Sequence, residues 1–305
     1  MKSILVVALA ISAFSMSSIY AVESEYDSDG RPWFVKYFKT GRVKEITGLK
    51  IPPGWRWSKN SHFLDIHPVL EELPVDFDLR TLHPTGKLQP IKRQRCGDCW
   101  AHSVLAVLET NWALKYPTQP LEIYAQQEFI STCPKTGGGC NGGYFDAFDY
   151  VSGKTGPGAP MEEDLPYKGY TTSCNHQVTK KPRAASWTYV GARENLRGPS
   201  IQQMKQALVS YGSLSVTVHA FSWEGSEIYK NCYAGSINHM VNIEGWHDFA
   251  TQAEKDKYGA DGYWIMRNSW GESFGDRGYA KVVYADRSGR KCNNLGSVAA
   301  VAVVN

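Results

Sequence analysis

The seven cysteines constrain the fold of this chain more than any other feature of its sequence. All of them follow residue 95, at Cys96, Cys99, Cys133, Cys140, Cys174, Cys232 and Cys292. In an oxidising compartment such a set forms disulfides, and an odd count leaves one thiol without an intramolecular partner. Two questions follow: whether the chain is exported, and which cysteine stays free.

The first 21 residues have the pattern of a secretory signal peptide. Lys2 precedes an apolar run from Ile4 to about Met16, and small residues then lead to Ala21. The run is shorter than the roughly 20 apolar residues that span a bilayer, which disfavours a membrane anchor. We expect a secreted or endolysosomal protein, or a periplasmic or extracellular one if it is bacterial.

The bulk composition decides less. A hydrophobic content of 42% over 305 residues allows one large or two modest domains with a buried core. The net charge is +3, and basic residues such as Lys92, Arg95 and Lys180 are scattered along the chain. This pattern predicts no nucleic-acid partner, and we expect these charges to lie on a solvated surface.

Residues 22–72 differ from the rest of the chain because they hold no cysteine and many aromatic and basic residues. The Pro52-Pro53-Gly54 stretch argues against one long helix. The aromatic residues are too apolar for a simple linker, and they are Trp33, Phe34, Tyr37, Phe38, Trp55 and Trp57. Composition leaves open two interpretations, a structural extension and a removable pro-segment.

The working domain is expected to span residues 73–305 and to form two lobes. Ala101, Leu105, Leu108 and Trp112 recur at helical spacing and predict a central helix that starts at Cys99. Asp98 stands at its N-cap position. Residues 133–200 are rich in Gly and Pro and indicate loops with short helices, whereas strand-like runs follow Ser200. We therefore expect an α+β fold, with a helical lobe at about 80–200 and a β-rich lobe at about 201–300.

The stretch QRCGDCWAHS contains two cysteines three residues apart. A zinc site would need a second pair of ligands at comparable spacing, and the other cysteines are single. A redox dithiol would normally lie in a βαβ unit, which this region lacks. The remaining interpretation is one structural cysteine beside one nucleophile.

Cys99 has the stronger physical claim to be the nucleophile. A thiol in the first turn of a buried helix lies at the positive end of the helix dipole, which favours the thiolate. His239 opens a strand-like run in the other lobe, from which a side chain can face that helix end. Asn268 can accept the ring N–H of His239, and Trp270 can shield that bond from water.

Taken together, these motifs strongly resemble the papain-like cysteine peptidases. They are Gln94, Cys96-Gly97-Asp98-Cys99-Trp100-Ala101, Cys140-Asn141-Gly142-Gly143, Asn238-His239 and Asn268-Ser269-Trp270-Gly271. The resemblance runs from about Leu73 to the C-terminus and includes LPVDFDLR, similar to the usual start of the mature enzyme. It implies the papain-like fold, with a helical left lobe, a barrel-like right lobe and a cleft between them.

The resemblance also implies the roles of individual residues. Cys99 would attack the peptide carbonyl, His239 would carry the proton, Asn268 would orient His239, and Gln94 would stabilise the oxyanion. The implied disulfides pair Cys96 with Cys140, Cys133 with Cys174, and Cys232 with Cys292. The implied substrate-binding residues are Gly142, Gly143, Tyr144, Phe145, Asn238, Met240 and Trp270, with Thr217 and Ser297 as further candidates. No cofactor and no metal are expected.

Four residues depart from the family pattern, and one of them is Asn238, which precedes the histidine where many members carry Asp. Gln94 lies one residue closer to the nucleophile than the family's oxyanion glutamine, so either it follows another backbone path or Arg95 distorts the oxyanion hole. Asp98 replaces a small residue, and its charge would disfavour a neighbouring thiolate if it faced the sulfur. Phe274 stands where a second tryptophan is common.

We expect a monomeric endopeptidase made as an inactive precursor, whose partners are peptide or protein substrates and its own pro-segment, residues 22–72. The mostly apolar pocket predicts a bulky apolar residue at the second position before the scissile bond. The chain shows none of the insertions that plug one end of the cleft in exopeptidase members. The alternatives are an inactive relative that acts as a binding protein and an acyltransferase that uses the same triad.

Overall fold

The computed structural model describes most of the chain after residue 71. It gives the backbone of residues 21–26, 32–37 and 44–45, and backbone and side chains of residues 47–50, 72–86, 88–131, 133–134, 138–152, 156–181, 183–191, 198–233 and 235–304. The expected signal peptide, apart from Ala21, and the six aromatic side chains noted in residues 22–72 lie outside this description.

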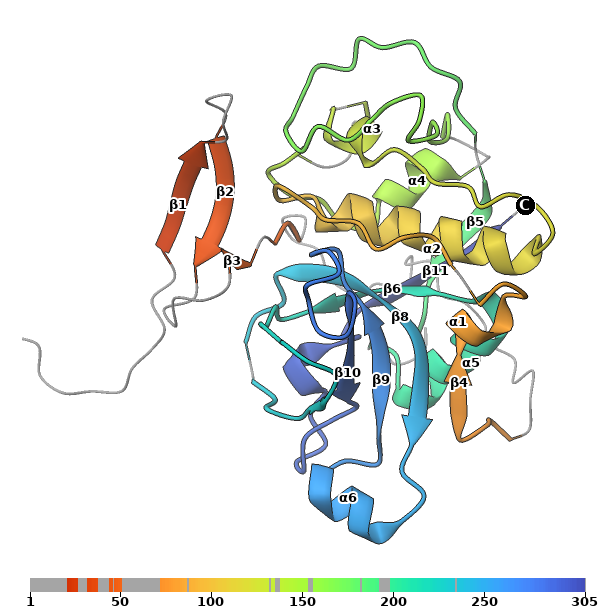
Figure 1. Ribbon diagram of the computed structural model, residues 1–305, viewed down its shortest axis with the longest axis vertical. Helices are drawn as coiled ribbons and strands as arrows, with labels where there is room; N and C mark the ends of the chain where they lie inside the picture. The colour runs from red at the N-terminus through yellow and green to blue at the C-terminus, as the bar shows by residue number, and fades with distance from the viewer. Residues whose placement is uncertain are drawn as a thin grey trace, which may run out of the picture.

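The helical lobe is built around α2 (Cys99–Lys115), which begins at the residue that the spacing predicts. Its first five residues are all buried, and buried residues continue on every side of the helix to Ala113. The short helices α1 (Leu79–Leu82), α3 (Gln126–Ile130) and α4 (Ala147–Val151) belong to the same half of the chain. Figure 1 shows α2 running between α3 and α4 on one side and the large sheet on the other.

The β-rich lobe contains a sheet of eight strands in the order β5-β11-β6-β8-β9-β10-β7, with β4 paired to β8. The strands are β4 (Asp76–Asp78), β5 (Ala184–Tyr189), β6 (Leu214–Val218), β7 (Ile228–Tyr229), β8 (His239–Asp248), β9 (Gly262–Arg267), β10 (Tyr279–Val283) and β11 (Ala299–Val304). All pairs are antiparallel except β10 with β7. Helices α5 (Ile201–Tyr211) and α6 (Gln252–Tyr258) and a 3-10 turn (Cys292–Asn294) complete the lobe.

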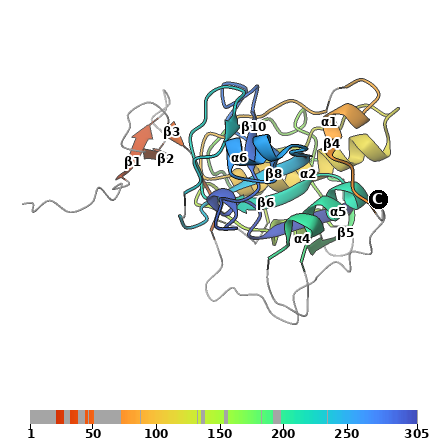
Figure 2. The same ribbon diagram turned by 90° about the horizontal axis from the view of Figure 1, so that it is seen from below.

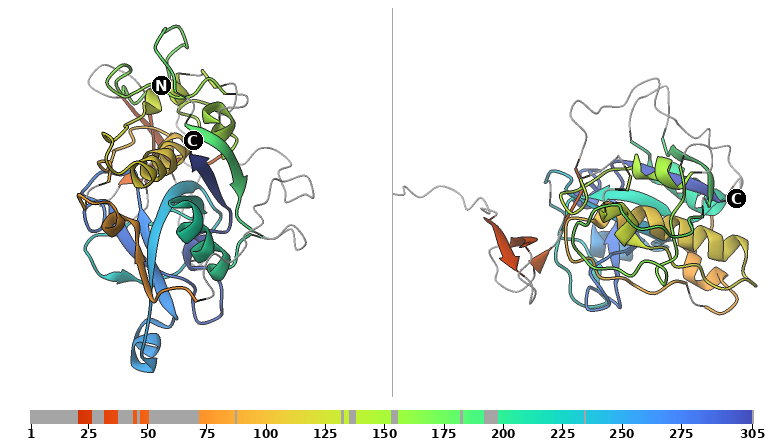
Figure 3. Two further views of the ribbon diagram at one scale, coloured as in Figure 1. Left: turned by 90° about the vertical axis from the view of Figure 1, so that its right-hand side faces the viewer. Right: turned by 90° about the horizontal axis from the view of Figure 1, so that it is seen from above.

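The strand-like runs after Ser200 are confirmed as the strands β6, β8, β9, β10 and β11. Strand β5 was expected to lie among the loops of the helical lobe, and that expectation is wrong because Ala184–Tyr189 pairs with β11. Figure 3 shows β5 beside β11. The α+β architecture of two lobes is confirmed, with one strand crossing the expected boundary.

Each lobe has its own apolar core. Around α2, Trp100 and Leu105 pack with Phe129, Phe145 and Met240. Between the large sheet and α5, the buried residues include Met204, Leu208, Ile243, Trp246 and Trp264. Since burial of such side chains contributes roughly 1.5–3 kcal/mol each, the cores hold α2 and the sheet rigidly beneath the loops that connect them.

Three disulfides staple the loops, and they join the pairs that the resemblance implies: Cys96–Cys140, Cys133–Cys174 and Cys232–Cys292. Cys99 is the free cysteine, and it is buried. No helix among the described residues is long and apolar enough to cross a bilayer.

Two lysines expected on a solvated surface instead bind buried carboxylates. Lys92 Nζ lies 3.1 Å from Glu109 Oε1, and Lys180 Nζ lies 2.5 Å from Glu128 Oε1. Both glutamates are almost completely buried. The expectation fails here because a buried carboxylate needs a cation as its partner. No local sequence pattern shows which lysine takes that role.

A small antiparallel sheet precedes the two lobes and consists of β1 (Ala21–Tyr26), β2 (Pro32–Tyr37) and β3 (Lys44–Glu45). Figures 1 and 2 show it beside the lobes and not within them. Its strands agree with the absence of a long helical pattern in residues 22–72. After β3, residues 47–50 reach the body of the protein.

Candidate active site

The loop before α2 and the first turn of that helix place Cys99 between the lobes. Asp98 occupies the N-cap position, as expected, but its side chain makes no capping hydrogen bond. Its fully buried carboxylate instead accepts a 2.6 Å hydrogen bond from the Tyr167 hydroxyl. The capping role is therefore wrong, because a phenol from a distant loop takes the place of the backbone N–H groups.

His239 begins β8 and Asn268 directly follows β9, so the neighbouring strands bring the two residues together. His239 Nε2 lies 2.9 Å from Asn268 Oδ1. The Trp270 ring stacks on the imidazole, with centroids 4.8 Å apart, and Phe274 packs edge-on against Trp270. The other ring nitrogen, Nδ1, is buried and has no hydrogen-bond partner among the described residues. This arrangement leaves Nδ1 available for a thiol proton.

Hydrogen bonds between the lobes fix α2 against β8. Ser103 Oγ lies 2.6 Å from Ser215 Oγ and donates to the Val241 carbonyl at 2.9 Å. In return, Asn242 Nδ2 donates to the Ser103 carbonyl at 2.9 Å. Ser103 is one helical turn beyond Cys99, and Val241 is two residues beyond His239, so these bonds set the position of the thiol relative to the imidazole.

The shortened loop keeps Gln94 beside the site. Gln94 is 2% exposed, its Nε2 donates to the Cys96 carbonyl at 2.9 Å, and its Oε1 accepts from the Ser269 hydroxyl at 2.6 Å. Its backbone N–H also donates to the Ser269 carbonyl. Arg95 turns away and lies against Gly169. The Arg95 side chain is exposed and packs on the outside of the loop, which argues against the possibility that Arg95 distorts the oxyanion hole.

Sequence reasoning missed Ser269 and Tyr167. Ser269 follows Asn268 directly and holds Gln94 through its hydroxyl and its carbonyl. It belongs to the motif on which the resemblance rests, so its position offered a signal. Tyr167 lies far from the motifs along the chain, and no local pattern connects it with Asp98.

Residues 47–50 lie across the site. Lys50 N–H donates to the Gly143 carbonyl at 2.9 Å, Gly143 N–H donates to the Gly48 carbonyl at 2.9 Å, and Leu49 N–H donates to the Asn238 carbonyl at 3.2 Å. The Leu49–Gly143 pairing is parallel. A Cβ on Gly48 would lie 2.1 Å from the Gly97 carbonyl oxygen, so only glycine allows this approach to the backbone beside Cys99.

Burial holds the thiol and the imidazole in their neutral forms. Desolvation raises the pKa of Cys99 to about 12, against the favourable backbone N–H groups of Met240 and Gly48. Desolvation lowers the pKa of His239 to about 4, although the hydrogen bond to Asn268 acts in the opposite direction. With residues 47–50 in place, the pair is therefore un-ionised near neutral pH.

Of the expected substrate-binding residues, Gly143 and Asn238 form backbone hydrogen bonds with residues 47–50. Tyr144, Phe145, Met240 and Thr217 are buried, and Leu49 packs against the apolar cluster that contains the first three. Ser297 is half-buried. Gly142 and Gly143 leave room for the segment and for the Trp100 ring: a Cβ on Gly143 would lie 2.3 Å from that ring, and Gly142 adopts a φ of +108°.

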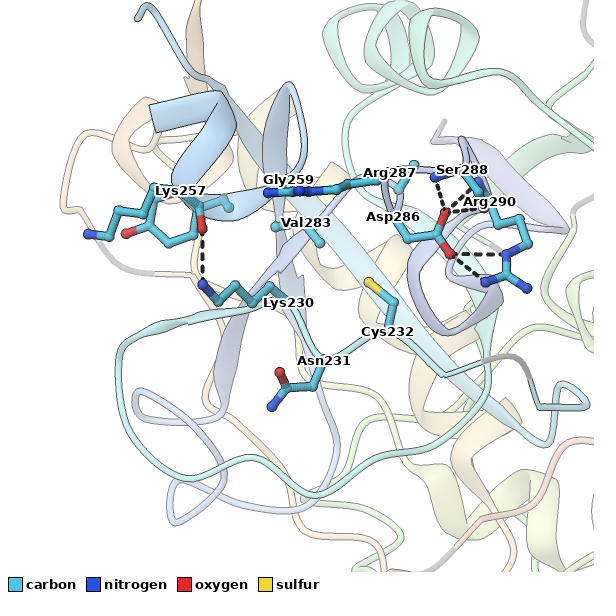
Figure 4. A pocket seen from close by; sticks show the side chains of 12 residues that line it. Lys230, Asn231, Cys232, Lys257, Gly259, Val283, Asp286, Arg287, Ser288 and Arg290 are labelled. Atoms are coloured by element: carbon cyan, nitrogen blue, oxygen red, sulfur yellow. Dashed lines mark hydrogen bonds and ion pairs between the residues drawn. The ribbon is translucent and has the colours of Figure 1, made fainter. Parts of the chain in front are cut away.

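A cavity and a group of residues of metal-ligand type lie away from the catalytic candidates. A cavity of about 510 Å³ in the β-rich lobe is bordered by Lys230, Lys257, Arg287 and Arg290 and contains none of the catalytic candidates (Figure 4). Among the described residues, one group of metal-ligand type is compact enough to bind an ion, and it comprises Cys133, Cys174 and His176. Its two sulfurs are joined in a disulfide, and His176 contacts Glu128.

The chain is similar to known proteins in both sequence and fold. The family described as papain family cysteine protease matches residues 73–302. Mouse cathepsin K is 31% identical over 84% of this chain and 73% of its own length, and rat procathepsin L is 31% identical over 95% and 84%. The structure of the digestive procathepsin L2 proteinase from Tenebrio molitor larval midgut has a TM-score of 0.65 at 23% identity, covering 85% of this chain and 78% of that one.

Proposed function

The chain belongs to the papain family of cysteine proteases, and we propose that it is the exported, inactive precursor of a monomeric endopeptidase. Family membership makes it a cysteine peptidase, a hydrolase. The proposal adds that residues 22–72 are a pro-segment, that residues 73–305 are the peptidase, and that Cys99, His239, Asn268 and Gln94 carry the reaction.

In the proposed reaction, the Cys99 sulfur attacks the peptide carbonyl and His239 Nδ1 takes the thiol proton. The tetrahedral oxyanion is stabilised by the Cys99 backbone N–H and the Gln94 side chain. His239 then returns the proton to the leaving amine, and an acyl-thioester remains on Cys99. Water, deprotonated by His239, releases the acid and regenerates the thiol. Asn268 keeps Nδ1 directed at the sulfur throughout.

The main support for the proposal is that residues 47–50 lie across the catalytic candidates. The segment pairs its backbone with Gly143 and Asn238 and buries the thiol. We propose that it lies in the non-productive direction common to the pro-segments of this family, and that cleavage just before Leu73 activates the enzyme.

The experiment compares the precursor with the product of its controlled cleavage before Leu73. We expect the cleaved chain to hydrolyse an internally quenched peptide, the precursor to be inactive, and the excised segment to inhibit when added back. Cys99→Ala should abolish the activity of the cleaved chain. Equal activity of precursor and product would make residues 22–72 a structural extension. A cleaved chain that iodoacetamide labels at Cys99, but that cleaves no peptide, would be a binding protein.

The substrate preference is proposed from Leu49. Its side chain packs against the large apolar cluster that contains Tyr144, Phe145 and Met240, three of the residues predicted to line the pocket for the second residue before the scissile bond. In a peptide library, we expect cleavage at internal bonds and a preference for a bulky apolar residue at the second position before the cleaved bond. Equal cleavage with acidic or basic residues there, or release of terminal residues alone, would contradict this preference.

A further inference from the structure

Three polar side chains form a group behind the loop that carries both oxyanion donors; two of them are buried, and the third, Tyr167, is half-buried. The loop is residues 94–99, and the group, called here the Asp98 cluster, comprises Asp98, His102 and Tyr167. None of the three has a role in the reaction proposed above. Ionisable groups are rarely buried unless they are paired. We therefore expect polar partners to hold these side chains next to the nucleophile.

Tyr167 joins both halves of the loop through one hydroxyl. Its oxygen accepts a 2.9 Å hydrogen bond from the Arg95 backbone N–H and donates at 2.6 Å to Asp98 Oδ2. Arg95 directly follows Gln94, and Asp98 directly precedes Cys99. The phenol therefore connects the two positions adjacent to the two oxyanion donors.

His102 completes the group from the next turn of α2. Its Nε2 lies 3.4 Å from the same Asp98 oxygen, and its ring packs edge-on against Tyr167 with centroids 5.4 Å apart. Asp98 is fully buried and His102 is 5% exposed. Burial and the Asp98 carboxylate raise the pKa of Tyr167 well above its usual value, so the hydroxyl stays protonated and donates.

The other supports of the loop leave this side free. Ser269 holds Gln94, and the Cys96–Cys140 disulfide holds the middle of the loop together with the Gly97 N–H bond to the Cys140 carbonyl. The Asp98 backbone N–H donates within the loop to the Cys96 carbonyl at 2.9 Å, but neither support reaches the Arg95 N–H or the Asp98 side chain. A loop one residue shorter than the family pattern has fewer ways to pair its backbone N–H and C=O groups. The Tyr167 hydroxyl pairs the Arg95 N–H.

We propose that Tyr167 and Asp98 are positioning residues that hold the shortened loop in the shape required for oxyanion stabilisation. The inference rests on the proposed function, because it assumes peptide hydrolysis at Cys99. The negative charge of Asp98 opposes thiolate formation at the adjacent residue. The cluster therefore stabilises the geometry of the oxyanion hole, whereas the charge of Asp98 makes the Cys99 thiol less reactive.

The test separates these two effects in enzyme that an added protease has processed from the full precursor. Hydrolysis of a fluorogenic peptide uses the oxyanion hole, whereas alkylation of Cys99 by iodoacetamide does not. Tyr167→Phe should lower kcat roughly 10–100-fold, since small misplacements of catalytic groups cost up to about 100-fold, with KM and the alkylation rate within about twofold. Asp98→Asn should also slow hydrolysis but speed alkylation.

Tyr150→Phe is the matched control. It removes a hydroxyl bonded to the buried Glu128 carboxylate in the same lobe, far from the loop along the chain. We expect it to change neither rate. The inference is overturned if Tyr167→Phe leaves kcat unchanged, or if it lowers hydrolysis and alkylation equally, which indicates general loosening. If the wild-type enzyme itself hydrolyses nothing, the proposed function fails instead.

Discussion

At the scale of single residues, the arrangement depends on which nitrogen of His239 faces the sulfur. Asn268 Oδ1 engages Nε2 at 2.9 Å and leaves Nδ1 free, while Trp270 covers the bond. Substitution of Asn268 by Ala removes this restraint. A hydrogen bond to a group that becomes charged is worth about 1.5–3 kcal/mol, so we expect kcat/KM to fall roughly 10–150-fold.

Steady-state kinetics of the processed Asn268→Ala enzyme on a fluorogenic peptide check this expectation. Thermal unfolding serves as the control, because a large loss of stability would make the kinetic change uninformative about orientation. Asn268→Gln, which keeps the amide on a longer side chain, should recover part of the loss. Unchanged kcat/KM in a well-folded Asn268→Ala enzyme would show that β8 alone orients the imidazole.

At the scale of elements, residues 47–50 close the site because a glycine lies where any side chain would collide. The Cβ of an alanine at position 48 would meet the Gly97 carbonyl at 2.1 Å, and that carbonyl belongs to a loop stapled by a disulfide. Overpacking of this kind costs about 1–3 kcal/mol. Gly48→Val should therefore loosen the segment and raise the alkylation rate of Cys99 in the uncleaved precursor about tenfold or more at pH 6.

Lys50→Ala provides the comparison for Gly48→Val. Lys50 is exposed, and alanine keeps both its backbone N–H bond to Gly143 and its Cβ. This variant should react as slowly as the wild-type precursor. If Gly48→Val precursor also reacts at the wild-type rate, the contact between residue 48 and the loop does not hold the segment in place.

At the scale of the whole molecule, the buried His239 makes the stability of the precursor depend on pH. Burial lowers its pKa from 6.5 to about 4, so below pH 6.5 the unfolded chain binds a proton that the folded chain does not. Stability that is present above pH 6.5 is therefore lost as the pH falls towards 4. The loss through this group is about 3 kcal/mol, at about 1.4 kcal/mol per pKa unit.

Urea unfolding of the precursor at pH 7 and pH 4 measures this loss. Cys99→Ser should be present in every sample, to prevent self-cleavage in acid. Adding His239→Gln removes the titrating group, so the decrease in unfolding free energy between the two pH values should be smaller by about 3 kcal/mol. The same decrease with and without His239 would show that other groups account for acid sensitivity.

The sequence by itself was sufficient for whatever depends on local order along the chain. The spacing of apolar residues predicted the helix at Cys99 and the strands after Ser200. The order of short motifs indicated the family, and the resemblance to that family implied the cysteine pairs. The period of the apolar residues shows which face of a helix or strand packs against the core, and this can be seen within one element. A motif places the residues that it needs close together in the sequence.

Only the tertiary structure decided what depends on residues distant in sequence. Ala184–Tyr189 is a strand because β11 lies beside it, and the side chain of Asp98 turns from the helix end to the Tyr167 hydroxyl. Likewise, residues 47–50 reach Cys99 because Gly48 fits against Gly97. Each outcome is a competition among hydrogen-bond partners or for space, and the competitors meet only after the chain has folded.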